Sequence, residues 1–553
     1  MAKIADRYIK THPYKIIEEG LHLAKTKVSE SLFSLGNEYH GIRGFFDEGG
    51  SVDSLQGSYF NGIYEYALEE TPNAYKGIVK RTHFMINSVN WVKCSIIINN
   101  QKLDLGKNQI KDFVRELDFQ TGVLTRSFIW LVGNEEVRIT FKRLLSMNVC
   151  TRAFQIIEIT AAKEFNVNLS LELDSDVLHW SNHCYYDEYK QGSLDDAYFL
   201  EVKTPLTKQK VVSLMKIEGV DDGIVSTFPK RVKVDYSFTL KPNEKKTITR
   251  YVVNHIDKKQ DYTFDDLLLK AKKDLDESFK EGYQRQFEQN SDYWKTFFDE
   301  HDIVIEGDEE NQQGIRFCLF QLQQTYHGYD ESNNIGAKGL TGEAYSGHTF
   351  WDSETYCLSY YLLNNIDAAR NLLLYRYHTL PQAKKRAKML DCEGACYPIA
   401  TLNGDEACNL WQHASLQFQP STGVAFAIFH YMNLTDDLEF VQNYGYEMLI
   451  EISKFMLNRG SYNANKTGFG YYCVMGPDEF QMMVNNNTYT NFMAKKTFEY
   501  TLEIRKKLSD AYLVEEKCQV DDAFFEKIKL ASEKMIILYD DKTKLFEQHE
   551  GFF

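Results

Sequence analysis

Two adjacent carboxylates, Asp478 and Glu479, stand in the segment 476–480, which reads GPDEF. Glycine and proline favour a turn at this point and disfavour helix. A turn that projects Glu479 into a cleft would let it act as a general acid, provided that poor solvation keeps it protonated at neutral pH. The alternative is a polar turn leading into an asparagine-rich loop, because residues 485–487 are all asparagine, which favours turns.

A lone acid of this kind raises the question of its partner. Cleavage of a glycosidic bond normally takes two carboxylates, one on each side of the bond. Asp478 cannot be the second one, because neighbouring side chains in a chain point apart. The GPDEF segment by itself therefore predicts an acid and leaves its partner open.

A second candidate segment, 339–354, reads GLTGEAYSGHTFWDSE and delivers His348, Trp351, Asp352 and Glu354 before a predicted helix. An indole face beside a carboxylate can stack on a sugar ring and accept hydrogen bonds from its hydroxyl groups. The alternative is an ordinary helix start, in which Asp352 caps the helix and Glu354 lies in its first turn. The two interpretations are compatible.

A third segment, 392–413, contains Asp405, Glu406, Trp411 and His413. These residues stand in one of the helix-poor stretches where we expect a ligand site, because chemistry usually resides on loops held by rigid elements. A loop followed by a capped helix explains the two acids without any function. A short basic cluster, Lys384, Lys385, Arg386 and Lys388, is typical of a solvated helix face. The sequence contains no credible P-loop, GxGxxG or Ser/His/Asp motif.

The composition of the chain limits which classes of partner and function are expected. The chain has 553 residues, 43% hydrophobic, which predicts two to four domains. Its net charge of -16 argues against nucleic acid and anionic membrane as partners. The amino terminus has no apolar signal region, and the ten scattered cysteines form no Cys-x-x-Cys pair. We therefore expect a cytoplasmic protein with reduced thiols and no metal site.

The elements that must position these residues change character along the chain. Up to about residue 255 the apolar pattern has period two, as in NVNLSLELD (166–174) and RVKVDYSFTL (231–240). A hairpin is predicted to turn at residues 120–122, which read Gln-Thr-Gly. Many strands with no helices between them predict an antiparallel β-sandwich over residues 1–260.

Helical periodicity replaces this pattern over residues 261–305, which we interpret as a helical linker. A helical domain is predicted for residues 306–553, with loops gathering the candidate residues. The predicted helices span 311–327, 353–363, 366–378, 380–390, 421–432, 435–458, 491–513 and 523–538.

Taken together, the chain resembles the inverting α-glucosyl disaccharide phosphorylases of glycoside hydrolase family 65, which act on maltose, trehalose, kojibiose or nigerose. The resemblance runs from residue 34 to near 538. It is carried by SLGNEYHGIRGFFDEG (34–49), DSLQGSYFNGIY (53–64), GLTGEAYSGHTFWDSE (339–354), LLLYRYHTLPQAKKRA (372–387), VMGPDEF (474–480) and VNNNTYTN (484–491).

The resemblance implies an α+β multidomain protein: a β-sandwich, a helical linker and an (α/α)6 barrel. It also implies that Glu479 protonates the glycosidic oxygen while inorganic phosphate attacks the opposite face of the sugar. Phosphate is already an anion, so no general base is needed and the missing partner is the co-substrate. The expected products are β-glucose 1-phosphate and a free acceptor sugar.

By the same resemblance, Trp351 and Asp352 would hold the glucose next to the cleaved bond. His348, Glu354, Trp411 and Asn487 are further predicted substrate-binding residues. No metal or organic cofactor is implied, and the expected partners are a disaccharide and phosphate, without nucleic acid or membrane. A homodimer is compatible with this assignment.

Two departures from the family pattern affect these expectations. Ile399 follows Pro398 where the family often has tryptophan, which leaves the acceptor sugar open. Family members also continue past the position of Phe553 with a phosphate-binding loop and further helices, so we expect an incomplete, C-terminally truncated barrel. Two alternatives stay open: an inverting α-glucoside hydrolase, which would need a general base about 6.5–9.5 Å from the acid, and a non-catalytic sugar-binding fragment.

Overall fold

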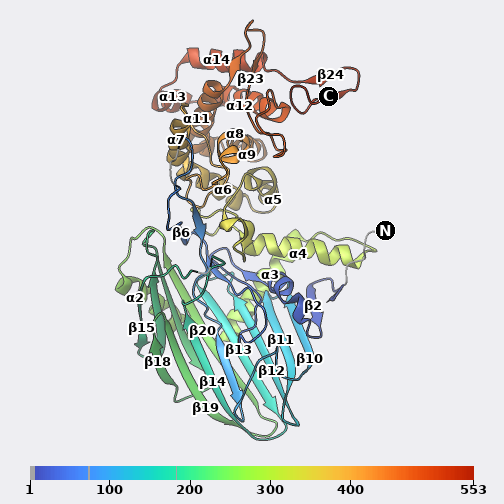
Figure 1. Ribbon diagram of the computed structural model, residues 1–553, viewed down its shortest axis with the longest axis vertical. Helices are drawn as coiled ribbons and strands as arrows, with labels where there is room; N and C mark the ends of the chain where they lie inside the picture. The colour runs from blue at the N-terminus through green and yellow to red at the C-terminus, as the bar shows by residue number, and fades with distance from the viewer. Residues whose placement is uncertain (1–6, 72–74, 182) are drawn as a thin grey trace. The chain divides into compact units, whose positions relative to one another are not determined.

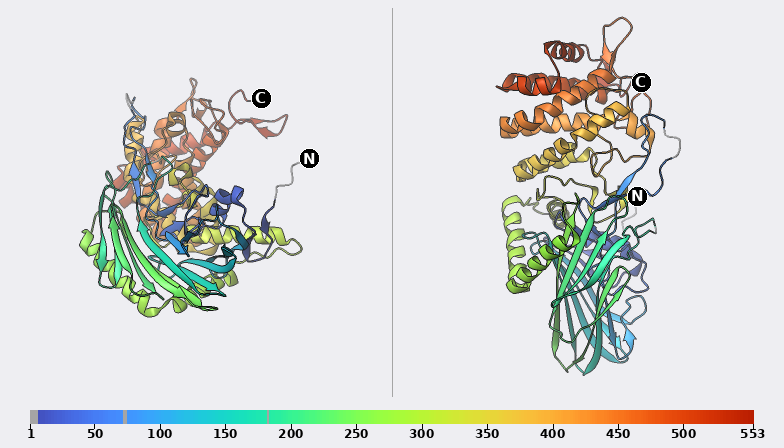
Figure 2. Two further views of the ribbon diagram at one scale, coloured as in Figure 1. Left: turned by 60° about the horizontal axis from the view of Figure 1, so that its bottom comes forward. Right: turned by 90° about the vertical axis from the view of Figure 1, so that its left-hand side faces the viewer.

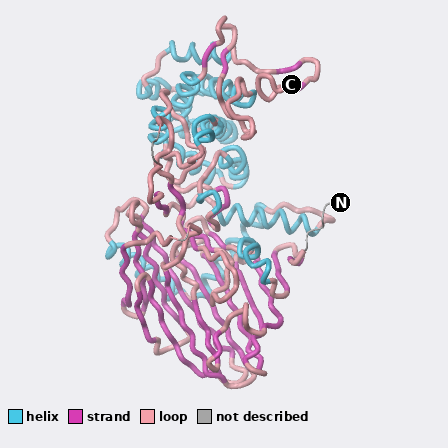
Figure 3. The backbone as a smooth tube through the Cα atoms, viewed as in Figure 1, coloured by secondary structure: helices cyan, strands magenta, loops and turns pink. Residues whose placement is uncertain are grey.

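The structure, a computed structural model, describes residues 7–71, 75–181 and 183–553. The chain divides by its internal contacts into two units. The first comprises residues 1–65, 85–327 and 338–344, and the second comprises 66–84, 328–337 and 345–553. Most strands lie in the first unit and most helices in the second (Figures 1 and 3). This confirms a sheet-rich amino-terminal part followed by a helical carboxyl-terminal part.

The first unit is built on two antiparallel sheets (Figure 1). The larger sheet has the order β1-β2-β10-β11-β12-β13-β20-β17-β16-β15 and the smaller one β18-β19-β14-β8-β9. The larger sheet comprises β1 (Ile9–Lys10), β2 (Lys15–Glu19), β10 (Ile110–Asp118), β11 (Val123–Val132), β12 (Glu135–Leu145), β13 (Arg152–Ala161), β20 (Lys245–Asp257), β17 (Lys210–Glu218), β16 (Ala197–Lys203) and β15 (Glu188–Leu194). The smaller comprises β18 (Ile224–Phe228), β19 (Arg231–Leu240), β14 (Phe165–Asp174), β8 (Cys94–Ile98) and β9 (Gln101–Lys102).

The period-two pattern produces this core. On β14 the alternate residues Val167, Leu169, Leu171 and Leu173 are buried, and β14 pairs with β19 over its whole length. The predicted hairpin is confirmed, since β10 ends at Asp118 and β11 begins at Val123. Gly122 adopts φ +65 there, and a Cβ at this position would lie 2.2 Å from Trp294 Nε1. Glycine is therefore required here for two reasons: the positive φ, and the lack of space for a side chain.

The segment 34–49, which carries part of the family resemblance, supplies buried charges to the sandwich. Arg126 donates hydrogen bonds to Glu48 and Asp47, and Arg143 Nε donates to Asp47 Oδ1 at 3.0 Å. All four side chains are buried. Burial raises the pKa of the Asp47 carboxyl, but the two guanidinium groups outweigh it and hold that pKa below its usual value. These acids therefore have a structural role.

Helices cover the outer face of the large sheet in the first unit. The helix α2 (Phe264–Glu281) contacts β17 and β20 (Figure 2), and Thr263 and Asp266 form a reciprocal capping box at its start. Its apolar stripe, Leu267, Leu268, Ala271 and Leu275, joins the buried cluster on that face. The helices α3 (Tyr283–His301) and α4 (Glu309–Thr325) follow. By contacts, α4 belongs with the sandwich, whereas the sequence places a boundary near residue 305.

The second unit contains the predicted helices from 353–363 onward, with local changes. They are α5 (Leu358–Asn364), α6 (Ile366–His378), α7 (Leu380–Met389), α8 (Trp411–Leu416), α9 (Gln419–Thr435), α10 (Leu438–Phe440), α11 (Tyr446–Arg459), α12 (Thr488–Lys507), α13 (Ala511–Cys518) and α14 (Asp522–Glu533). The short helix α8 was not predicted. A π-helical turn, Ser353–Cys357, precedes α5, and another, Val441–Gly445, precedes α11. No helix of the described residues is long and apolar enough to cross a membrane.

A buried acid on the large sheet predicts a pH-dependent stability. Glu201 on β16 is fully buried, its oxygens have no hydrogen-bond partner among the described residues, and Lys190 Nζ lies 4.0 Å away. Burial raises the pKa of Glu201 from 4.5 to about 7, with Lys190 opposing the shift and Asp265 adding to it. Between pH 4.5 and about 7, Glu201 is ionised in the unfolded chain but still protonated in the folded protein. The free energy of unfolding therefore falls as pH rises through this range.

We expect Glu201→Gln to become progressively more stable than the parent as pH rises from 5 to 8. The neutral amide avoids the burial of a charge, whose cost reaches up to about 3 kcal/mol above the folded-state pKa. Urea denaturation of both proteins at pH 5, 6.5 and 8 measures the difference. A difference that does not change with pH would show that Glu201 is not the responsible group.

Candidate active site

The GPDEF segment forms the tip of a loop closed by two backbone hydrogen bonds between Val474 and Val484, at 2.9 and 3.0 Å. The two acids at this tip have different surroundings. Asp478 accepts hydrogen bonds from Phe480 N at 3.1 Å and from Gln548 Nε2 at 2.7 Å, so its carboxylate holds the turn. The Glu479 side chain is 55% exposed. Of the pair, Glu479 is the acid that remains available.

Two side chains from α8 and the residue that follows it orient the Glu479 carboxylate. Gln417 Nε2 donates to Glu479 Oε1 at 3.1 Å, and His413 Nδ1 lies 3.3 Å from the same oxygen. Gln417 is buried, and its amide also contacts His413 Nδ1 and Met475 Sδ. Glu479 Oε2 makes no hydrogen bond to another described residue. One carboxylate oxygen is thus held, and the other is available to a ligand.

This arrangement differs from the sequence prediction in one respect. We expected a poorly solvated acid, whereas more than half of the Glu479 side chain is exposed in the described chain. Gln417 was not predicted, because a buried glutamine four residues after His413 has no distinctive local signal. His413 was among the candidates, and only the fold shows that it lies beside Glu479.

Trp351 and Asp352 immediately precede the π-helical turn Ser353–Cys357. The Trp351 ring lies 6.0 Å from the Tyr489 ring of α12, and Asp352 is exposed. The Asp352 side chain makes no capping hydrogen bond, so the helix-cap interpretation is not realised for it. An exposed carboxylate beside a partly exposed indole is therefore compatible with the predicted sugar platform.

Three other predicted sugar ligands have structural partners instead. Glu354 is 2% exposed and accepts hydrogen bonds from Arg376 Nε at 2.6 Å and Nη2 at 2.9 Å. His348 is buried, its Nε2 lies 2.7 Å from the His83 carbonyl oxygen, and burial lowers its pKa to about 4. The geometry does not support sugar binding by Glu354, because both of its carboxylate oxygens are bonded within the protein. His348 is buried and its Nε2 is already engaged, which argues against a direct role for that atom.

Asn487, the third of these residues, caps α12 and supports the acid loop. Its Oδ1 accepts a hydrogen bond from Thr490 N at 3.0 Å, and its Nδ2 donates to the Gln548 carbonyl oxygen at 3.2 Å. The side chain is buried against Gly476, where an added Cβ would lie 2.3 Å from Asn487 Nδ2. Asn487 therefore positions the GPDEF loop, and the geometry does not support direct contact with substrate.

In the loop 391–410, Glu406 bonds to the backbone of its own loop and does not cap the helix that follows. Glu406 accepts hydrogen bonds from the backbone N–H groups of Ile399, Ala400 and Cys408, at 2.9, 3.4 and 3.0 Å. The N-cap of α8 is Leu410, without a side-chain cap. Burial nevertheless raises the pKa of Glu406 to about 7. Trp411 begins α8 with 43% of its surface exposed, so it remains available to a ligand.

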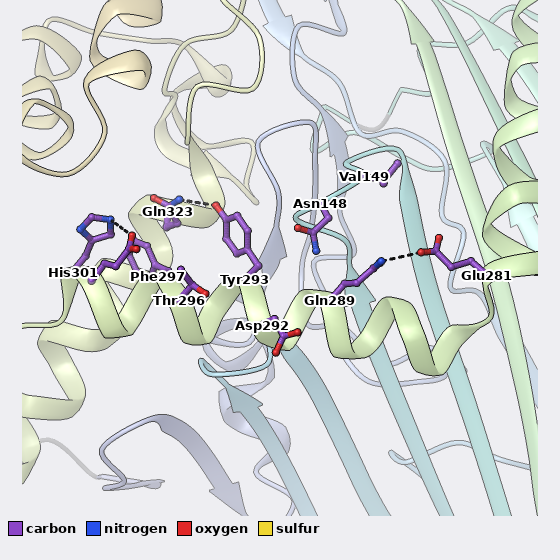
Figure 4. Close-up of a pocket in the computed structure, with 11 residues that line it drawn as sticks. Asn148, Val149, Glu281, Gln289, Asp292, Tyr293, Thr296, Phe297, His301 and Gln323 are labelled. Atoms are coloured by element: carbon purple, nitrogen blue, oxygen red, sulfur yellow. Dashed lines mark hydrogen bonds and ion pairs between the residues drawn. The ribbon is translucent and has the colours of Figure 1, made fainter.

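A separate groove in the first unit contains none of these residues. This 660 Å³ groove follows α3 (Figure 4). Its polar side chains bond to one another: Gln289 Nε2 donates to Glu281 Oε1 at 2.9 Å, and Gln323 Nε2 donates to the Tyr293 hydroxyl at 2.7 Å. Within the described residues, no group of three or more His, Cys, Asp or Glu side chains is placed to hold a metal ion.

The sheet-rich part and the helical part that carries Glu479 each match a domain of one enzyme family. Residues 16–297 match the N-terminal domain of glycosyl hydrolase family 65, and residues 316–553 match its central catalytic domain. The chain belongs to glycosyl hydrolase family 65.

Several proteins of known name align with most of the length of this chain. It is 32% identical to maltose phosphorylase of Bacillus subtilis (strain 168), over 99% of this chain and 73% of the relative. It is 28% identical to kojibiose phosphorylase of Thermoanaerobacter brockii, over 95% of this chain and 70% of the relative. A solved structure of a candidate kojibiose phosphorylase from the human microbiome is 51% identical. It matches with a TM-score of 0.96 over 100% of this chain and 73% of that one.

Proposed function

We propose that the protein catalyses the phosphorolysis of an α-linked glucosyl disaccharide with inversion, forming β-glucose 1-phosphate and a free acceptor sugar. The family and the names of the relatives support a disaccharide phosphorylase. The observation that carries the mechanism is the contrast between the two acids of GPDEF. Asp478 is bonded into the turn, and Glu479 keeps one oxygen free. A single available acid is what phosphorolysis needs, so this contrast supports the proposal.

This geometry supports the following roles for the residues. Gln417 donates to Glu479 Oε1, so the proton of the neutral acid belongs on Oε2. From there it passes to the glycosidic oxygen as the bond to the acceptor breaks. A phosphate oxygen forms the new bond to the anomeric carbon from the opposite face. Phosphate attacks as an anion, so no side chain has to remove a proton from it.

His413 has a supporting role in this proposal. Its Nδ1 lies 3.3 Å from Glu479 Oε1, so the imidazole ring helps to fix the position of the carboxylate. Trp351 and Asp352 would hold the glucose unit, and Trp411 would contact the sugar from the start of α8. Phosphate is the proposed co-substrate, with no metal or organic cofactor. We further infer that the helices of the second unit belong to an (α/α)6 barrel and that the protein is cytoplasmic.

A direct assay tests the proposed function. The purified protein is incubated with maltose, trehalose, kojibiose or nigerose, with and without inorganic phosphate, and the anomeric proton of glucose 1-phosphate is followed by NMR. We expect phosphate-dependent release of the β anomer, with one disaccharide preferred. Glucose released at the same rate without phosphate would indicate a hydrolase, and α-glucose 1-phosphate would contradict inversion.

A further inference from the structure

A second cavity, in the helical unit, has a composition unlike that of the chain as a whole. It has a volume of about 670 Å³, and its walls are the segment 75–80 and the helix α7. Of the described residues that line it, five are lysines and none is acidic: Lys76, Lys80, Lys384, Lys385 and Lys388. The chain carries a net charge of -16, so this local excess of positive charge stands out. We call this cavity the lysine pocket.

Two of the five charges are uncompensated. Lys385 Nζ lies 3.0 Å from Asp405 and Lys384 Nζ lies 3.4 Å from Glu451, while Lys76 pairs with Asp391. Lys80 and Lys388 are exposed and form no ion pair with any described residue. With a Debye length near 8 Å at physiological salt, these nearby lysines, and not the acidic remainder of the surface, dominate the potential that a bound ligand meets.

The walls of the lysine pocket are joined by a buried arginine. Arg386 of α7 is 3% exposed, and its Nη1 donates to the Gly77 carbonyl oxygen at 2.6 Å. Its Nη2 donates to the Ala414 carbonyl oxygen of α8 at 2.7 Å. Gly77 adopts φ +87, which suits glycine, and lines the pocket itself. The segment 75–80 is thus fixed against α7, about 300 residues away in sequence, and the pocket is preformed.

The five lysines favour an anionic ligand, and the other residues that line the pocket indicate which further groups that ligand carries. Tyr75 is 82% exposed, and Ile78, Pro381 and Met389 add apolar surface. A volume of this size is in the range of small-ligand sites, about 300–1,000 Å³. Lysine ammonium groups bind phosphate as point charges, and an exposed phenol ring can stack on a planar or cyclic group. We propose that the lysine pocket binds a phosphorylated small molecule that carries a ring, either a sugar phosphate or a nucleotide.

Titration calorimetry on the whole protein tests this, with inorganic phosphate, glucose 6-phosphate and AMP as separate probes. The variant K80Q/K388Q removes the two uncompensated charges, and K527Q/K529Q on α14 removes two exposed lysines elsewhere as a matched control. We expect at least one ring-bearing phosphate ester to bind more tightly than inorganic phosphate. Its Kd should rise at least about tenfold in K80Q/K388Q, stay unchanged in the control, and rise with added salt.

The two esters distinguish the source of the ligand, since glucose 6-phosphate reports a sugar phosphate and AMP a nucleotide. Tyr75→Ala should weaken the ester that binds and leave inorganic phosphate unaffected. Equal affinity in K80Q/K388Q and the parent would overturn the proposal, as would the lack of saturable binding for both esters. The readout is binding heat, so a failure of the proposed phosphorolysis would leave this result unaffected.

Discussion

Substituting glutamine for Glu479 is expected to lower kcat for phosphorolysis by about 10²–10⁴ while KM for the disaccharide changes little. The amide keeps the size of the side chain and can still accept the hydrogen bond from Gln417. It cannot deliver a proton to the glycosidic oxygen. Loss of the chemical step with binding retained is the expected signature of a general acid, measured by initial rates over a range of disaccharide concentrations.

The neighbouring acid offers a matched control. Asp478→Asn makes the same chemical change one residue away, at a carboxylate that accepts hydrogen bonds from Phe480 N and Gln548 Nε2. We expect this variant to retain most of its activity, with a small loss of stability at the turn. If Asp478→Asn loses activity as severely as Glu479→Gln, or if Glu479→Gln retains near-parent turnover, the assignment of the acid is wrong.

The largest expected effect on stability comes from the buried ion pair between Arg376 and Glu354, the last residue of the segment FWDSE (350–354). Arg376→Met should destabilise the helical unit by about 3–5 kcal/mol, because it leaves the Glu354 carboxylate buried without its partner. Both side chains are at most 2% exposed, and the pair is bidentate, at 2.6 and 2.9 Å. Urea denaturation followed by circular dichroism at the helical signal measures the change.

The paired substitution R376M/E354L separates a broken ion pair from poor packing. Removing both charges should restore most of the stability that Arg376→Met loses, since no buried charge then remains unpaired. A double variant that is as unstable as the single one would contradict this explanation. Glu354→Gln adds a functional test: if it raises KM for the sugar without lowering stability, Glu354 contacts substrate after all.

Local sequence patterns determined the elements. Alternating apolar residues such as those of β14 specify strands with one buried face, and the hairpin at residues 120–122 follows from its turn residues. Helical periodicity predicted α6 over its exact range, Ile366–His378. Glycine and proline predicted the turn that presents Glu479. These features depend on neighbours within a few residues, so they can be read without the fold.

Tertiary structure decided which polar side chains remain available to a ligand. FWDSE contains two acids that the sequence treats alike, but Arg376, 22 residues later, engages Glu354 and leaves Asp352 exposed. Gln417 reaches Glu479 across 62 positions, and His348 meets the carbonyl of His83, which lies 265 positions away. The lysine run of α7, predicted to be a solvated face, becomes one wall of a pocket only because the segment 75–80 packs beside it. Hydrogen bonds and ion pairs depend on distance in space, and a local pattern holds no information about a partner that chain folding brings from elsewhere.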